Sequence, residues 1–146
     1  MPTTGPAMLS PLQILVLRRG WAAVAVVAFH FVSITIQEGQ GSLNRVTHML
    51  GGAAAAYLAS GMLRYGSDWF GSPKVPARQL IVFCIATTVA VFWEFVEYVF
   101  NNGLAMNVQY GLSEAILDLV MGCFGAALYV LGSSCWTIGR RRTQPG

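Results

Sequence analysis

Six ionisable side chains lie within otherwise apolar stretches of this chain. They are two imidazoles and four carboxylates: His30, His48, Glu94, Glu97, Glu114 and Asp118. Imidazole and carboxylate groups bind Zn²⁺, Mg²⁺ and Mn²⁺ and also serve as general acids and bases. Because a charged group is costly in lipid, an ionisable residue within a membrane span indicates a functional site. The sequence therefore indicates where a site lies, but it does not identify a reaction.

The spacing of these residues indicates how they are presented. Glu94 and Glu97 are three residues apart, and Glu114 and Asp118 are four apart, so each pair lies on one face of a helix. A rise of about 1.5 Å per residue then predicts two tiers at different depths below one membrane surface. The deeper tier holds His30, Glu94 and Asp118, and the shallower tier holds His48, Glu97 and Glu114.

The composition is typical of an integral membrane protein. Of 146 residues, 55% are hydrophobic and 10% are charged, which a soluble domain of this size does not show. Four apolar runs each approach the roughly 20 residues that cross a bilayer. The runs are Trp21 to Gln37, Val46 to Leu63, Gln79 to Phe100 and Leu112 to Ile138. We expect an all-α integral membrane fold in which residues 1–146 form a single domain, a bundle of four transmembrane helices.

The distribution of Lys and Arg predicts the orientation of this bundle. Arg45 lies in one connection, and eight other basic residues flank the spans on the opposite side: Arg18, Arg19, Arg64, Lys74, Arg78, Arg140, Arg141 and Arg142. Both termini should therefore be cytoplasmic, in a multi-pass protein of the bacterial inner membrane. The net charge of +3 follows from this topology, so no nucleic-acid partner is expected.

Small residues continue the polar faces along the predicted helices. His48 is followed at helical spacing by Gly52, and Asp118 by Gly122 and Gly125. Glycine and alanine at such positions let transmembrane helices approach closely. We therefore expect the six ionisable groups to converge inside the bundle rather than face lipid.

The charge of the cluster requires a counterpart, because no Lys or Arg is predicted at the same depth. Protonated histidines, protonated acids, or one or two divalent cations could each supply it. Zn²⁺, Mg²⁺ or Mn²⁺ would suit the predicted metal ligands, which are His30, His48, Glu94 and Asp118. Glu97 or Glu114 would then be the general base that activates a water molecule.

Three motifs carry a resemblance to a known group of proteins. They are HMLGG at His48 to Gly52, FWEFVEY at Phe92 to Tyr98 and LSEAILDLVMGCFGA at Leu112 to Ala126. Together they resemble small bacterial inner-membrane proteins of the YjdF-like and VanZ-like group. The resemblance implies a membrane bundle and no substrate. The polar residues that it implies are His48, Glu94, Glu97, Glu114 and Asp118.

Three functions remain open from the sequence. The first is a metal-assisted enzyme that acts on a lipid or an envelope precursor, with membrane lipid as the partner. The second is a protein that moves protons or cations along the same acids. The third is a non-catalytic interaction or assembly protein, because small bundles of this kind often oligomerise.

Overall fold

The computed structural model describes residues 10–37, 42–104 and 111–142, and every element in this part of the chain is a helix. Four of the helices are long and one is a single turn. They are α1 (Pro11–Gln37), α2 (Ser42–Tyr65), α3 (Ser67–Phe70), α4 (Val75–Leu104) and α5 (Leu112–Arg142). The predicted all-α class is therefore confirmed for the described residues.

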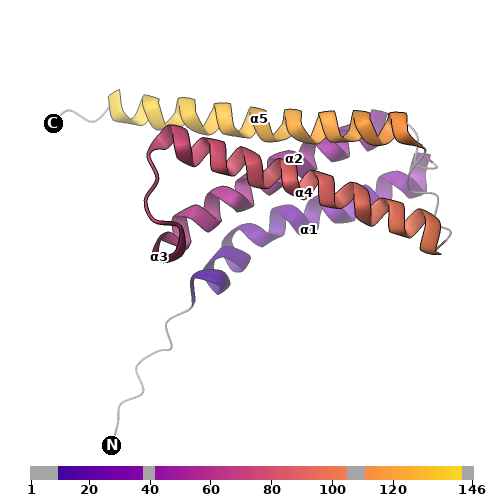
Figure 1. Ribbon diagram of the computed structural model, residues 1–146, viewed down its shortest axis with the longest axis horizontal. Helices are drawn as coiled ribbons and strands as arrows, with labels where there is room; N and C mark the ends of the chain where they lie inside the picture. Colours follow the sequence, from indigo (N-terminus) through magenta and orange to yellow (C-terminus); the bar gives the residue numbers. More distant parts are fainter. Residues whose placement is uncertain (1–9, 38–41, 105–110, 143–146) are drawn as a thin grey trace, which may run out of the picture.

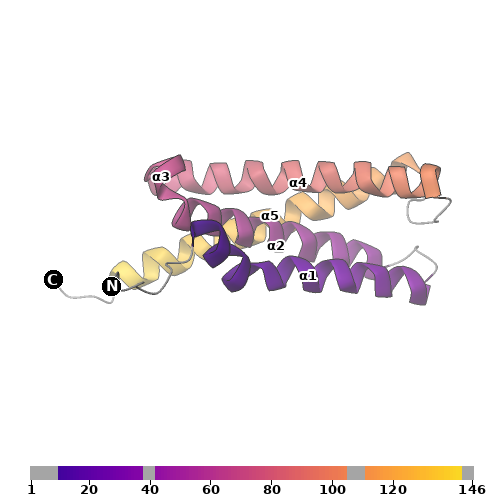
Figure 2. The ribbon, with the colours of Figure 1, turned by 90° about the horizontal axis from the view of Figure 1, so that it is seen from below.

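Helix α2 is the centre of the packing. It contacts α1, α4 and α5, whereas α1 makes no close backbone contact with α4 or α5 in the described residues. In Figure 1 the start of α1, the end of α5 and α3 lie at one end of the molecule. Figure 2 shows α4 and α1 on either side of α2 and α5. α1 is therefore joined to α4 and α5 through α2 and through side-chain contacts rather than by close backbone packing.

Glycines permit the close crossing of α2 and α5. A Cβ atom added at Gly52 would overlap the backbone carbonyl of Gly122, and one added at Gly125 would overlap the carbonyl of Met49. The predicted stripe of small residues is thus the surface along which these two helices meet. Farther along the same face of α2, Ala56 and Ala59 are fully buried and continue this contact.

Three of the long helices are long and apolar enough to cross a membrane. The candidate spans are Pro11–Ile36, Val75–Gly103 and Leu112–Thr137, with α2 not among them. The difference from the four predicted spans has a physical reason. Glycine, alanine and polar residues, among them Asn44, Arg45 and His48, lower the hydropathy of α2, which faces the other helices more than the surroundings. The other three helices carry most of the exposed large apolar side chains.

The first helix begins at Pro11 rather than at the predicted Trp21. Ser10 and Gln13 form a reciprocal cap, in which the Ser10 N–H donates to Gln13 Oε1 at 2.8 Å and the Gln13 N–H donates to Ser10 Oγ at 3.3 Å. Such a capping box starts a helix, and proline suits its first position. Arg18 and Arg19 therefore lie within α1 instead of preceding it.

Arg19 connects α1 to α2 at the end of the molecule where α1 begins. Its guanidinium donates to the Tyr57 carbonyl oxygen at 2.5 Å and also to Ser60 Oγ. It also stacks on the Tyr57 ring, with Cζ 4.3 Å from the ring centroid. The Ser60 and Tyr129 hydroxyls are 2.7 Å apart, so the network reaches α5.

We expect Gly52→Ala and Gly125→Ala to destabilise the protein by about 1–3 kcal/mol, because each added methyl group would push α2 away from α5. The measurement is the thermal unfolding midpoint in detergent. Gly132→Ala is the matched control, since nothing lies within 4 Å of its Cβ position. Equal midpoints for all three variants would contradict the close crossing.

Candidate functional site

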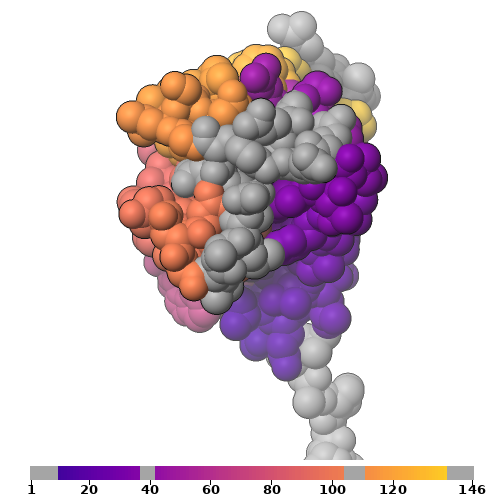
Figure 3. Space-filling model, turned by 90° about the vertical axis from the view of Figure 1, so that its right-hand side faces the viewer, coloured from indigo at the N-terminus to yellow at the C-terminus, as the bar shows by residue number. Residues whose placement is uncertain are grey.

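Five of the six predicted site residues converge at one end of the four long helices. This is the end where α1 and α4 finish and α2 and α5 start, and Figure 3 looks directly onto it. Each of the five is at least nine-tenths buried: His30, His48, Glu94, Glu97 and Asp118. The expectation that these groups face the interior is confirmed for them.

His48 lies at the centre of the cluster. Its Nδ1 atom is 3.5 Å from Glu94 Oε1, and its Nε2 atom is 3.5 Å from both Glu97 Oε1 and Asp118 Oδ2. These separations exceed the usual hydrogen-bond range of about 2.7–3.2 Å. One imidazole from α2 thus stands between carboxylates of α4 and α5 without a short bond to any of these three.

Glu97 is the most deeply buried member of the cluster, with 1% of its surface exposed. Its Oε1 atom accepts a hydrogen bond from Trp93 Nε1 at 2.5 Å and lies 3.2 Å from His30 Nε2. The Trp93 ring also packs edge-on against His30, with ring centroids 5.2 Å apart. Glu97 is therefore held in position by α1, α2 and its own helix.

Asp118 joins α5 to the start of α2. Its Oδ2 atom accepts a hydrogen bond from Asn44 Nδ2 at 2.9 Å. Three buried atoms near this bond have no hydrogen-bond partner among the described residues: Asp118 Oδ1, His48 Nε2 and Asn44 Oδ1. Buried polar atoms rarely lack a partner, so this part of the cluster is unusual for a protein interior.

Glu114 does not join the cluster. Its side chain is 38% exposed and lies 3.7 Å from that of Arg45, which is 48% exposed. The two predicted tiers therefore merge into one cluster of five, with Glu114 outside it. The spacing of Glu114 and Asp118 puts them on one face of α5, as predicted. Glu114, however, lies in the first turn of this helix, where it pairs with Arg45 instead of a histidine.

Two overlapping sets of side chains have ligand atoms close enough for a metal ion. One is His30, His48 and Glu97, and the other is His48, Glu94, Glu97 and Asp118; within each set the atoms lie within 4.8 Å of one another. Two ligands of one tetrahedral ion, each about 2.0–2.2 Å from it, stand roughly 3.3–3.6 Å apart. The separations from His48 Nε2 to Glu97 and Asp118, both 3.5 Å, fall in this range.

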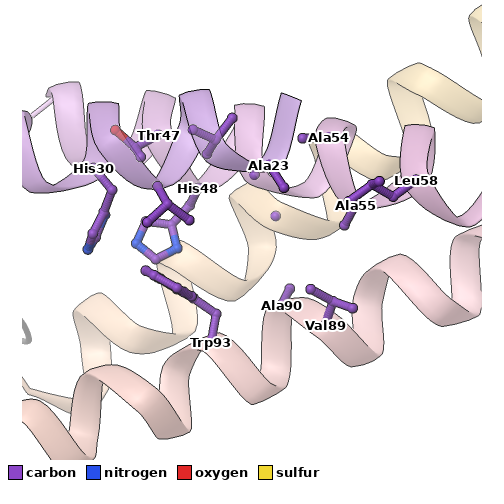
Figure 4. Close-up of a pocket in the computed structure, with 14 residues that line it drawn as sticks. Ala23, His30, Thr47, His48, Ala54, Ala55, Leu58, Val89, Ala90 and Trp93 are labelled. Atoms are coloured by element: carbon purple, nitrogen blue, oxygen red, sulfur yellow. The ribbon is translucent and has the colours of Figure 1, made fainter. Parts of the chain in front are cut away.

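A cavity of about 130 Å³ lies directly beside the cluster. Figure 4 shows His30, His48, Thr47 and Trp93 at one end of it, with Ala55, Leu58 and Val89 toward the other. Its walls come from α1, α2 and α4, with Gly122 of α5 beneath them. The polar cluster therefore borders a mostly apolar space.

A family described as predicted membrane protein (DUF2238) matches residues 21–138. The chain belongs to this family. The matched stretch includes all six predicted site residues and every described helix in whole or in part. No curated protein and no solved structure matches the chain. The family description names no reaction, and the resemblance to the YjdF-like and VanZ-like group stays a prediction.

In this DUF2238 member, sequence reasoning missed two residues that touch the carboxylates, Asn44 and Trp93. Asn44 lies just outside the predicted span Val46 to Leu63, and Trp93 is not among the six predicted site residues. A signal for Trp93 was present, because it precedes Glu97 by one helical turn and so shares its face.

We expect Trp93→Phe to lower stability by about 1–3 kcal/mol, because it removes a donor to a buried carboxyl group and keeps the aromatic ring. The measurement is again the unfolding midpoint in detergent. Trp69→Phe is the matched control, since Trp69 is 75% exposed in α3. Identical shifts in the two variants would show that the Trp93 hydrogen bond does not stabilise the site.

Proposed function

We propose that this DUF2238 protein spans the bacterial inner membrane four times, with both termini in the cytoplasm. The length of α2 supports its inclusion, because 24 residues extend over about 36 Å, more than the roughly 30 Å of hydrocarbon. Its polar residues cluster inward against three apolar helices, which provide the contact with lipid. Arg64, Lys74 and Arg78 lie at the end where α1 begins, which the excess of basic residues assigns to the cytoplasm.

This topology predicts that reporters fused to either terminus report the cytoplasm. A fluorescent protein at each end should fluoresce, whereas alkaline phosphatase at each end should be inactive. Alkaline phosphatase inserted between α1 and α2, near residue 40, is the positive control and should be active. An active phosphatase at one terminus only would mean an odd number of crossings and would contradict the proposal.

We also propose that the buried cluster binds a divalent cation and serves a metal-assisted enzyme. One observation carries this proposal: three buried carboxylates and two buried imidazoles are in mutual contact, and within the described residues the ion pairs of Glu97 and Asp118 are with histidines and not with Lys or Arg. A cation would offset charge that is otherwise costly at this depth. It would also provide the partner that His48 Nε2 and Asp118 Oδ1 lack within the described chain.

The residues divide into binding and supporting roles. His48, Glu97 and Asp118 would hold the ion, which moves Glu97 from the predicted base to a ligand. Trp93 and Asn44 orient two of these ligands through hydrogen bonds, as the neighbours of metal ligands commonly do. Zn²⁺, Mg²⁺ or Mn²⁺ held there would activate a water molecule or polarise a substrate oxygen.

His30 has a separate role in this proposal. It contacts Glu97 and also lines the cavity, so it can donate a proton to, or accept one from, a molecule held between α1 and α4. The class of reaction that fits is hydrolysis or group transfer on a lipid or a lipid-linked envelope precursor, because the cavity is apolar and lies in the membrane. Glu114 and Arg45 stand outside the cluster, where their ion pair is exposed.

Elemental mass spectrometry on protein purified in detergent without chelators tests the metal site. We expect a stoichiometric divalent metal in the wild type and its loss in Glu97→Gln and Asp118→Asn, which remove charge at nearly constant volume. Glu114→Gln is the matched control and should retain the metal. A metal-free wild type would contradict the proposal and would favour acids neutralised by protonation.

Turnover is measured on the same samples. The protein reconstituted in liposomes of total bacterial inner-membrane lipid should form a product that lipid mass spectrometry detects. The product should be missing for EDTA-treated protein and for Glu97→Gln. Metal binding without any such product would support the metal site and contradict the proposed enzymatic activity.

A further inference from the structure

The cavity beside the cluster has two chemically different parts. At one end stand His30, His48 and Trp93, and along the rest stand Gly, Ala, Val and Leu side chains. Figure 4 shows this division along the length of α2. From His48 to Leu58 the helix rises about 15 Å. The space is therefore polar at the cluster and apolar toward the middle of the helices.

The cavity opens between α1 and α4. These helices make no close backbone contact in the described residues, so only side chains cover the space between them. Val27 of α1 and Val89 of α4 both line the cavity and are 39% and 49% exposed. Because both belong to helices apolar enough to cross a membrane, the opening faces hydrocarbon rather than water.

We infer that this cavity takes the hydrocarbon chain of a single-chain amphiphile, or one chain of a lipid, which enters sideways between α1 and α4 and places its polar group at His30 and His48. The inference rests on the proposed function and identifies where its substrate lies. An amphiphile fits because it has the same division into a polar end and an apolar length as the cavity. It also reaches the opening from the bilayer without crossing water.

The volume limits what can enter. An apolar cavity of about 150 Å³ accommodates a benzene ring, so about 130 Å³ accommodates a short segment of one chain. Fused rings and two parallel chains exceed it. The substrate should therefore be unbranched and narrow next to its polar group.

Gly51 and Ala23 offer a way to fill the cavity from two different walls. A Cβ atom at Gly51 would meet only Val26 Cγ1, at 3.7 Å, which is an ordinary contact. Ala23 lines the cavity from α1 and is only partly buried. Gly51→Leu and Ala23→Leu should thus occupy the space without separating the helices.

The test uses the full chain in nanodiscs with a fatty acid that carries a photoactivatable diazirine next to its carboxyl group. We expect labelling in the wild type at cavity-lining residues such as Val26 and Ala90, located by peptide mass spectrometry. Gly51→Leu and Ala23→Leu should each reduce this labelling several-fold and leave the metal content unchanged. Gly132→Leu, at an exposed and open position of α5, should alter neither.

Other outcomes separate the two proposals. Labelling confined to outward side chains such as Phe92 and Phe95, or unaffected by both cavity-filling variants, would overturn this inference whatever the metal content. Protection of the cavity walls by a second copy of the chain would overturn it as well. Cavity labelling in a protein without metal would support the chain-binding site and contradict the metal proposal alone.

Discussion

The burial of three carboxylates together with two imidazoles is the constraint on which the rest of the structure depends. Each ionised group costs several kcal/mol in a low-dielectric interior unless partners surround it. The five residues come from α1, α2, α4 and α5, so four helices must converge at one depth. The glycine crossing meets this requirement, because Gly52 and Gly122 bring α5 close enough for Asp118 to stand 3.5 Å from His48. The burial of the cluster thus depends on the close packing of α2 against α5.

The central position of α2 also explains the cavity. The middle of α2, from Gly51 to Gly61, is mostly Gly and Ala and fills little volume, so α1 and α4 can both lie against it without filling the space between them. At the cluster, His30 and Trp93 bridge that space through side chains. Away from the cluster, Ala54 and Ala55 leave it open. Small residues on one side of α2 thus permit close packing against α5, and small residues on another side leave the cavity open.

The sequence predicted which helix faces point inward, but it did not predict which side chains contact one another between helices. Helical periodicity placed Glu94, Glu97 and Asp118 on interior faces, since that depends only on spacing along one helix. Periodicity could not predict that Glu114 pairs with Arg45, because this contact depends on where α5 lies relative to α2 along the helix axes. Hydropathy counted four spans, whereas length and apolarity in the structure support three, because a helix buried by its neighbours need not be strongly apolar. The start of α1 was missed because the Ser10 and Gln13 cap precedes a stretch with two arginines.

The distribution of polar contacts along α2 bears on which function is chemically reasonable. At one end α2 contributes to the cluster, and at the other Ser60 bonds to Arg19 and Tyr129, about 18 Å away along the helix axis. Between these ends α2 presents Gly and Ala, and the Thr87 and Thr88 hydroxyls on α4 donate to carbonyls of their own helix. The described residues therefore provide no chain of hydrogen-bonding side chains from one network to the other, as a proton relay would require. α1 contacts α2 through Arg19 near its start and contacts the cluster through His30 near its end. A polar site at one end of the bundle beside an apolar cavity suits a reaction at the head of a lipid better than passage across the membrane.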